Sequence, residues 1–322
     1  MSACIGNHKT CSETFSGAIL DECTPPILPT RIIDVGSPDR EISPRLIETK
    51  GMAGYYVALS HCWGKPSKRP LMTTQSSIQS HLTNIPWELV PKAYQDAMTA
   101  TRRLGLQYIW IDSLCIIQDS HSDWLDESTH MGMVYENARL TIAASHASDS
   151  SQGCFFTRSH PPASIELSHI SQSGDREGSV FASSMPIDYV PITPELGPLA
   201  QRAWATQEWL LSRRMIFYTA DSLVWSCKMI TQRETGGSFH STARNHRWKI
   251  IIERYSARLL TKATDRLIAL EGLRKEMGKK RVNDTYCFGL WKTSMPDQLL
   301  WFCKDPAERS KSLLGLPTWT WA

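Results

Sequence analysis

Three short apolar segments decide the fold of this chain: YYVALSH (55–61), YIWIDSLCII (108–117) and LTIAA (140–144). Each is rich in β-branched and aromatic residues and is bounded by polar residues, which is typical of a buried strand. We therefore predict three strands within residues 55–145.

The two stretches between these segments have the signals of helices. Ser122 is the predicted N-cap of the second helix, and Asp123 and Asp126 in its first turn favour the positive end of the helix dipole. The first helix is predicted from Pro86 to Gly105, because residues suited to a buried face recur three and four positions apart. These residues are Val90, Tyr94, Ala97, Thr101 and Leu104.

The order strand, helix, strand, helix, strand predicts an α/β fold with a parallel sheet and flanking helices. Such units close with right-handed crossovers, and their ligands lie beyond the carboxyl ends of the strands. In this chain those ends carry residues 61–64, 115–119 and 145–146.

The remaining segments surround this core. We predict a flexible tail over residues 1–25, an edge hairpin over 26–50, an irregular insertion over 148–200, a helix over 202–211, a strand pair over 215–218 and 223–226, and a mostly helical C-terminal region that includes 245–277.

Composition narrows the class of protein. The chain has 322 residues and a net charge of +3, which argues against nucleic-acid binding. It contains no apolar run long enough for a membrane span and no signal-peptide pattern, so we expect a cytoplasmic protein. None of its nine cysteines forms a C-x-x-C pair, which predicts free thiols and no metal site.

Four longer blocks resemble the fungal heterokaryon-incompatibility (HET) domain. They are YVALSHCWG (56–64), YIWIDSLCIIQD (108–119), DWLDESTHMGMVYENARLTIAAS (123–145) and RAWATQEWLLSRRMIFY (202–218). The resemblance implies a HET domain over 26–228, with its core at 55–145, and a C-terminal extension over 229–322. The chain ends at LPTWTWA (316–322) without a polar cap, which suggests a shortened form of a longer protein.

The family implies a role in nonself recognition, in which incompatible fusion triggers programmed cell death. HET domains are in turn similar to TIR domains, which have flavodoxin-like folds and in some cases cleave NAD. The resemblance therefore implies self-association, an incompatibility partner protein and NAD as a nucleotide substrate, with no prosthetic group. Whether the chain is an enzyme stays open at this point.

Glu208 is the first candidate catalytic residue. NAD-cleaving TIR domains carry a Trp-x-x-x-Glu helix motif, and Trp204 and Glu208 match it. Spacing of four places the two side chains on one helix face, and a carboxylate can stabilise an oxocarbenium-like ribose. In the alternative interpretation, Glu208 pairs with Arg202, Arg213 or Arg214, and Trp204 belongs to the core.

A second set of candidates lies at the predicted strand ends. An aspartate there could accept hydrogen bonds from a ribose, and a glycine would let the backbone approach a phosphate. The alternative is that Asp112 caps a turn and Trp63 packs on the sheet. The candidates are His61, Trp63, Gly64, Asp112, Cys115 and Gln118.

A third hypothesis is a Cys115–His61 dyad oriented by Asp112, which would imply a hydrolase or acyltransferase. Against it, Cys115 lies in an apolar run, where cysteine is usually inert. The sequence thus leaves three functions open: a NAD glycohydrolase that uses Glu208, a non-enzymatic self-associating signalling module, and a cysteine-dependent enzyme.

Overall fold

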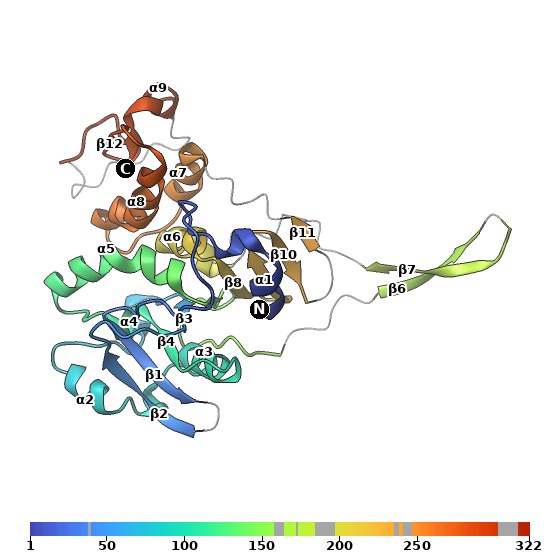
Figure 1. Ribbon diagram of the computed structural model, residues 1–322, viewed down its shortest axis with the longest axis horizontal. Coiled ribbons are helices and arrows are strands. Elements are labelled where there is room, and N and C mark those ends of the chain that lie inside the picture. Colours follow the sequence, from blue (N-terminus) through green and yellow to red (C-terminus); the bar gives the residue numbers. More distant parts are fainter. Residues whose placement is uncertain are drawn as a thin grey trace.

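The structure is a computed structural model that describes residues 1–37, 40–157, 164–171, 173–183, 197–234, 238–240, 247–301 and 315–322. Its centre is a mixed β-sheet flanked by helices (Figure 1). The strands of this sheet are β1 (Arg31–Ser37), β2 (Arg40–Glu48), β3 (Tyr56–Ser60), β4 (Tyr108–Trp110), β5 (Leu140–Ala143), β8 (Arg214–Tyr218), β9 (Leu223–Cys227), β10 (Ile230–Arg233) and β11 (Ser238–His240).

The strand order is β11-β10-β9-β8-β5-β3-β4-β1-β2. The four central strands, β4, β3, β5 and β8, are mutually parallel, and the outer strands pair antiparallel. Taken in chain order, the parallel strands follow the flavodoxin-like sequence 2-1-3-4, which confirms the predicted fold class. The chain reverses direction across the sheet between β3 and β5, so the switch point lies at their carboxyl ends.

Helices cover the sheet and extend beyond it. They are α1 (Ser2–Asn7), α2 (Ile78–Thr83), α3 (Lys92–Arg103), α4 (Asp112–Cys115), α5 (His121–Asn137), α6 (Trp204–Leu211), α7 (Trp248–Ser256), α8 (Glu271–Lys280) and α9 (Met295–Gln298). Within the described ranges, no helix combines the length and the apolar character needed to cross a membrane.

Two helices begin at other residues than predicted. The first helix, expected from Pro86, begins at Lys92, because Pro91 holds the residue before it, Val90, in an extended conformation. The second helix is capped by Ser120 rather than Ser122; the Ser120 hydroxyl accepts a hydrogen bond from the Asp123 N–H at 3.3 Å.

The predicted strand 108–117 is shorter than expected. Strand β4 ends at Trp110, and the short helix α4 follows from Asp112. The Asp112 carboxylate accepts a hydrogen bond from the Ser113 N–H at 2.7 Å, which favours a turn over further strand. The carboxyl end of β4 therefore comes earlier, and Asp112 lies directly at it.

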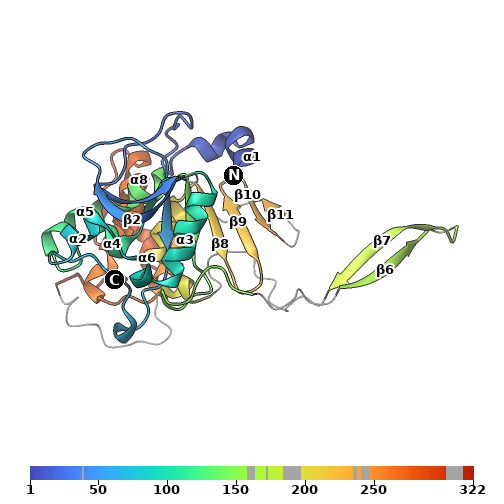
Figure 2. The same ribbon diagram turned by 90° about the horizontal axis from the view of Figure 1, so that it is seen from below.

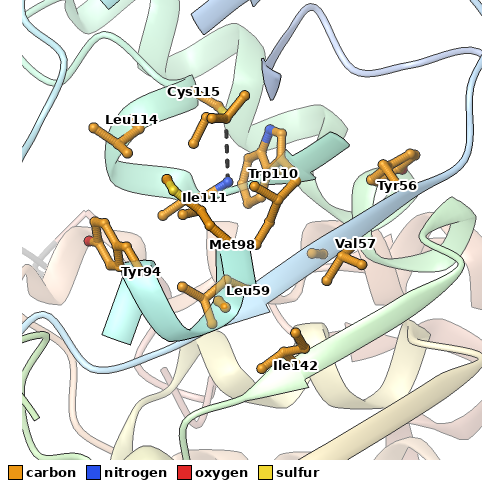
Figure 3. Close-up of a cluster of buried hydrophobic side chains, with 14 of the residues drawn as sticks. Tyr56, Val57, Leu59, Tyr94, Met98, Trp110, Ile111, Leu114, Cys115 and Ile142 are labelled. Carbon is orange, nitrogen blue, oxygen red and sulfur yellow. Dashed lines mark hydrogen bonds between the residues drawn. The ribbon is translucent and has the colours of Figure 1, made fainter. Parts of the chain in front are cut away.

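The core has two layers around β3. Successive side chains of a strand point to opposite faces, and every residue of β3 is buried. Val57 and Leu59 share a buried cluster with Tyr94 and Met98 of α3 (Figure 3). On the other face, the Tyr56 hydroxyl donates to the Val134 carbonyl of α5 at 2.7 Å. Burial of such apolar side chains contributes about 1.5–3 kcal/mol each.

The segments around the core differ in part from their predictions. The edge hairpin is β1–β2 and the strand pair is β8–β9, as expected. The insertion contains a regular hairpin, β6 (Ser164–Ile170) and β7 (Arg176–Ser183), drawn apart from the sheet in Figures 1 and 2. Residues 158–163, 172 and 184–196 of it lie outside the described part of the chain.

The first 25 residues, for which the sequence predicts a flexible tail, pack against the body in the structure. Cys4 of α1 and Cys11 of the following 3-10 turn (Lys9–Ser12) are buried. Glu22 forms ion pairs with Arg139, at 2.6 Å, and with Arg213 and Arg214, each at 2.5 Å. These contacts reach far along the chain, so local polarity does not reveal them.

The C-terminal region is helical but interrupted. The predicted helix over 245–277 divides into α7 and α8, separated by two 3-10 turns, Ala263–Arg266 and Ile268–Leu270. A small aromatic cluster joins α7 to the short strands β12 (Tyr286–Cys287) and β13 (Leu290–Trp291). Residues 302–314 lie outside the described part.

Candidate functional site

The candidate site lies at the carboxyl ends of the parallel strands. Ser60 ends β3 opposite Ala143 of β5, and the Ala144 N–H donates to the Ser60 carbonyl at 2.9 Å. Strand β3 is apolar up to Leu59, and its sequence then changes to the polar pair Ser60 and His61. The switch point of the sheet therefore carries polar side chains in an otherwise apolar setting.

Helix α6 places Glu208 at this switch point. Every residue of α6 after Trp204 is buried, and Glu208 has no exposed surface. Its Oε2 accepts a hydrogen bond from the Ser60 hydroxyl, and its Oε1 has no hydrogen-bond partner in the described structure. A buried carboxyl oxygen without a partner is costly, so its presence calls for an explanation.

The surroundings of Glu208 keep it close to half ionised at neutral pH. Burial raises the pKa of Glu208 to about 7; the charge of Arg202 and the Ser60 hydrogen bond oppose this rise, and the Asp112 charge adds to it. The nearby Glu208 charge, after burial, also raises the pKa of Tyr135. A carboxyl group with this pKa can serve as either an acid or a base near pH 7.

Asp112 and Arg202 form the second part of the site. The Trp63 indole N–H donates to Asp112 Oδ2 at 2.9 Å, and Arg202 Nη2 lies 3.7 Å from the same oxygen. Arg202 Nη1 is buried and has no partner among the described residues. Arg202 therefore has one side held by Asp112 and another side free to bind an anion.

His61 completes the strand-end group as a neutral imidazole. Its Nε2 shares a hydrogen bond of 2.8 Å with the Tyr94 hydroxyl, which in turn lies 2.7 Å from Ser113 Oγ. Burial lowers the pKa of His61 to about 4, although the Asp112 charge 3.7 Å away works against this. At neutral pH the ring is uncharged, and its Nδ1 has no partner in the described chain.

Four of the buried polar atoms that have no hydrogen-bond partner among the described residues lie at this edge of the sheet. Most buried polar groups in proteins are hydrogen-bonded to protein or to ordered water. A group of exceptions at a switch point matches the place where α/β sheets bind ligands. Within the described residues, the atoms at this edge are Glu208 Oε1, His61 Nδ1, Arg202 Nη1 and Ser145 Oγ.

A family comparison agrees with the resemblance seen in the sequence. Residues 56–208 match the family described as heterokaryon incompatibility protein (HET). The chain carries a HET domain. Comparisons with curated proteins and with solved structures gave no match. The HET domain indicates a function in heterokaryon incompatibility.

The matched stretch of the HET domain begins at the first residue of β3 and ends at Glu208. It contains the strand-end atoms described above, together with Trp63, Gly64 and Asp112. The family segment therefore ends in α6, the helix that places Glu208 beside Ser60 at the strand ends.

Cys115 does not join His61 in this HET domain. Its Sγ accepts a hydrogen bond from the Ile111 N–H at 3.5 Å, and neither nitrogen of His61 is hydrogen-bonded to it. Burial raises the pKa of Cys115 to about 12, so the thiolate is scarce at neutral pH. The structure thus lacks the predicted dyad, because the apolar run around Cys115 turns its thiol into the core.

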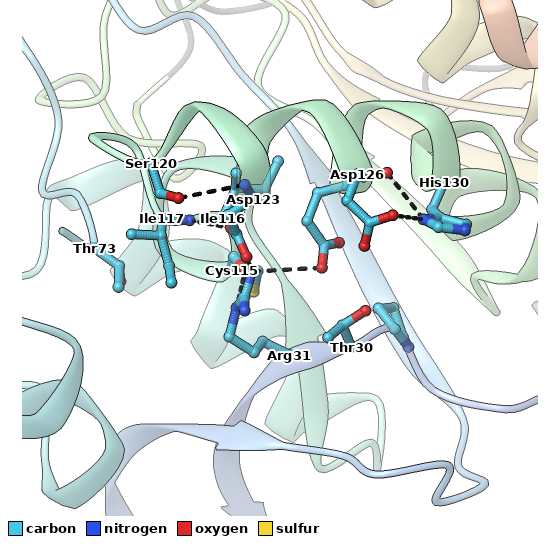
Figure 4. A network of polar contacts seen from close by, with 12 residues as sticks. Thr30, Arg31, Thr73, Cys115, Ile116, Ile117, Ser120, Asp123, Asp126 and His130 are labelled. Atoms are coloured by element: carbon cyan, nitrogen blue, oxygen red, sulfur yellow. Dashed lines mark hydrogen bonds and ion pairs between the residues drawn. The ribbon is translucent and has the colours of Figure 1, made fainter. Parts of the chain in front are cut away.

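The backbone of Cys115 has a structural role instead. Its carbonyl accepts from Arg31 Nε at 2.8 Å, and Arg31 Nη2 binds Asp123 at 2.6 Å (Figure 4). The Gln118 side chain donates to the carbonyls of Asp112 and Ile116, each at 3.0 Å. Gln118, predicted as a ligand-binding residue, holds the turn after β4 in this structure.

Trp204 and Gly64 have structural contacts as well. Trp204 is hydrogen-bonded to the Asp265 carboxylate, while Glu208 on the same helix faces Ser60. Gly64 has a φ of +81°, and a Cβ there would lie 2.5 Å from Cβ of Asp149. Gly64 is thus required for close packing beside the site, where we expected it to approach a phosphate.

Sequence reasoning missed several members of the site. Arg213 and Arg214, predicted as alternative partners of Glu208, bind Glu22, and only Arg202 faces the strand ends. Ser60 could have been found from its position at the end of an apolar strand. Tyr94 could not, because its helical spacing is that of an ordinary core residue.

Proposed function

We propose that the strand-end site of this HET domain hydrolyses the N-glycosidic bond of NAD, with Glu208 as its catalytic carboxylate, and that loss of NAD causes programmed cell death. The observation that carries this proposal is the burial of Glu208 at the switch point, with one carboxyl oxygen free and a pKa of about 7.

The chemistry suits a lone carboxylate. The bond between ribose C1′ and the nicotinamide nitrogen breaks with its electron pair going to nitrogen, which leaves an oxocarbenium-like ribose. Ionised Glu208 stabilises that positive charge in a site shielded from water. Water then adds at C1′ and releases a proton, and the products are nicotinamide and ADP-ribose.

Arg202 would hold the phosphates. Its guanidinium is fixed by Asp112 on one side and has a free N–H on the other. Arginine binds phosphate through charge-assisted hydrogen bonds. His61 is neutral, so it can donate to or accept from a ribose hydroxyl without adding charge.

Burial of Glu208 adds one requirement. Because its side chain has no exposed surface, substrate reaches it only after α6 or the neighbouring segments move. Assembly of several copies is the proposed trigger for that movement, so activity should rise with protein concentration.

The test is to incubate the purified protein with NAD over a range of protein concentrations and to measure nicotinamide and ADP-ribose. Glu208→Gln keeps the size of the side chain but removes its charge, so we expect release to fall by about 10²–10⁴-fold. Glu136→Gln is the matched control, because Glu136 is also buried and its pKa is also raised by burial, but it contacts the Phe15 N–H instead. Equal release by wild type and Glu208→Gln would reject the proposal.

A second candidate function, self-associating signalling without chemistry, has an observation of its own. The β6–β7 hairpin stands apart from the sheet (Figure 2) and exposes apolar side chains on β6. The exposed fractions of Ile165, Leu167 and Ile170 are 66%, 51% and 60%. Exposed apolar side chains grouped on one strand are typical of an interaction surface.

Under this candidate function, a hairpin variant and Glu208→Gln should differ in cell killing. Ile165→Ser with Leu167→Ser should abolish both assembly, followed by sedimentation, and cell killing, while Glu208→Gln should retain killing. If the hairpin variant kills normally, the signalling function is excluded.

A further inference from the structure

A cluster of metal-ligating side chains lies outside the candidate site. Cys4, His8 and Cys11 come from the N-terminal segment, and Cys227 ends strand β9. One ligand atom from each of the four lies within 4.8 Å of all the others. The sequence predicts no zinc site because it lacks a C-x-x-C pair, but here the fold supplies the fourth ligand from far along the chain.

The spacing of the four atoms suits a tetrahedral ion. Zinc bound at about 2.3 Å to thiolates keeps its ligand atoms about 3.8 Å apart. The Cys227 sulfur already lies 3.4 Å from His8 Nδ1. A bound ion therefore needs the remaining ligand atoms to move by no more than about 1 Å.

The three thiols are buried and remain free. Cys4 is 4% exposed, Cys11 and Cys227 are 0% exposed, and none of them is in a disulfide. One disulfide would use two of the three sulfurs and leave the third in the same buried pocket of side chains. A metal ion uses all three sulfurs and the imidazole together.

Backbone donors point at the sulfurs. The backbone N–H groups of Ile230 and Met229 donate hydrogen bonds to the Cys227 sulfur. Two backbone N–H groups on one sulfur, from the second and third residues after the cysteine, stabilise a thiolate rather than a thiol. The turn between β9 and β10 is thus shaped to hold a metal ligand.

Positive side chains lie around the cluster. The Arg214 guanidinium is fully buried, and its Nη2 donates to the Cys11 carbonyl at 3.3 Å. Lys228 donates to the carbonyls of Glu13 and Thr14 at 2.6 and 2.8 Å, beside Cys11. Three thiolates with a divalent ion carry one net negative charge, which Arg214 offsets.

We propose that Cys4, His8, Cys11 and Cys227 bind one structural zinc ion that fixes the N-terminal segment to strand β9. Binding replaces three S–H protons, which go to solvent, with three Zn–S bonds, and neutral His8 gives a lone pair from Nδ1. Thiolate and imidazole ligands in a tetrahedral set favour zinc over magnesium or calcium. With four protein ligands the ion has no open position, so its role is structural.

The first experiment measures zinc in protein purified without chelator from zinc-supplemented cells, by elemental mass spectrometry. We expect one zinc per chain in the wild type and loss of zinc in Cys11→Ser and in Cys227→Ser. Cys23→Ser is the matched control, because Cys23 lies in the same N-terminal segment but is exposed, and it should keep the zinc.

A second experiment covers the case in which these variants fail to fold. In His8→Cys, a fourth thiolate replaces the imidazole, so the variant should bind zinc. Replacement by Co²⁺ should give the visible absorption of a tetrahedral ion, with stronger thiolate charge-transfer bands than in the wild type.

Three results would overturn the proposal. They are a wild-type protein that is free of metal after zinc-supplemented expression, a Cys227→Ser protein that keeps its full zinc content, and a disulfide between any two of the three buried cysteines in freshly purified protein. None of these outcomes depends on the activity proposed for Glu208.

Discussion

The two edges of the parallel sheet differ in the partners of their carboxylates. At the carboxyl edge, Glu208 and His61 are buried with one polar atom each left unpaired. At the amino edge, Cys227 of β9 pairs with Arg214 at the start of β8, and Arg214 Nη2 forms an ion pair with Glu22. The Nε and Nη1 atoms of Arg214 have no hydrogen-bond partner among the described residues. The first edge carries the residues proposed to bind substrate, and the second carries the ion pairs that join the N-terminal segment to the sheet.

Both edges contain a fully buried charged side chain, since Glu208 and Arg214 are each 0% exposed. Burial alone therefore does not separate a binding site from a structural cluster in this protein. The distinction lies in the partners of the carboxylates: Glu208 is hydrogen-bonded to the neutral Ser60 hydroxyl, whereas Glu22 forms ion pairs with three arginines. Changes at the two edges should accordingly have different consequences.

The largest effect on stability is expected at the amino edge, from Glu22→Gln. Glu22 offsets Arg139, Arg213 and Arg214, two of which are almost fully buried. Removal of its charge leaves those guanidinium groups without a counter-ion, and we expect a loss of about 3–5 kcal/mol in urea unfolding. Asp21→Asn, at an exposed neighbour, should change stability by less than about 0.5 kcal/mol. A small effect of Glu22→Gln would contradict the assignment of this edge to structure.

At the carboxyl edge, Glu208→Gln should instead stabilise the protein above neutral pH. The pKa of Glu208 is about 7 in the folded protein, above its ordinary value of 4.5, so folding favours the protonated form. That contribution is fully present below pH 4.5 and is lost as the pH rises through 7, which corresponds to about 3 kcal/mol.

The measurement is urea unfolding of wild type and Glu208→Gln from pH 4.5 to 8.5. The two stability curves should separate as the pH rises, with the variant the more stable at pH 8.5. The depressed pKa of His61, about 4, acts on both proteins alike and cancels in the difference. Parallel curves would mean that ionisation of Glu208 does not destabilise the folded protein, and the contrast between the edges would be contradicted.

The smallest effect is expected from Gly64→Ala beside the site. A positive φ costs a non-glycine residue about 1 kcal/mol, and the new Cβ would also meet Asp149. Gly105→Ala measures the cost of the positive φ alone, because Gly105 has a φ of +75° but nothing within 4 Å of its added Cβ. The difference between the two variants therefore gives the cost of the Asp149 contact. We expect losses of about 2 and 1 kcal/mol in thermal unfolding; equal losses would show that the Asp149 contact is unimportant.

Much of the central fold could be predicted from sequence. Strands β3 and β5 and helix α6 follow from short-range pattern, because their residues are buried and regularly spaced. The prediction for β4 was too long, since an apolar run does not show that Asp112 will begin a helix. The start of α3 was misplaced where Pro91 outweighed the apolar spacing.

The candidate site was only partly predictable. Its members at the strand ends follow from topology, since parallel strands end at one edge. The contact between Ser60 and Glu208 joins residues far apart in the chain, and no local pattern encodes it. The cysteine cluster was missed for the same reason, because Cys227 lies far along the chain from Cys4 and Cys11 and is close to them only in the folded structure.

The depth of Glu208 has a consequence for the cell that makes this protein. Under the proposed function, the inactive protein keeps its catalytic carboxylate buried, so a high concentration of folded protein in this state is not toxic. Harm then depends on how frequently α6 loosens from the sheet, a rate that small changes in packing could tune. Natural variants with altered packing around this helix would differ in their activity in the absence of assembly, even when every strand-end residue is unchanged.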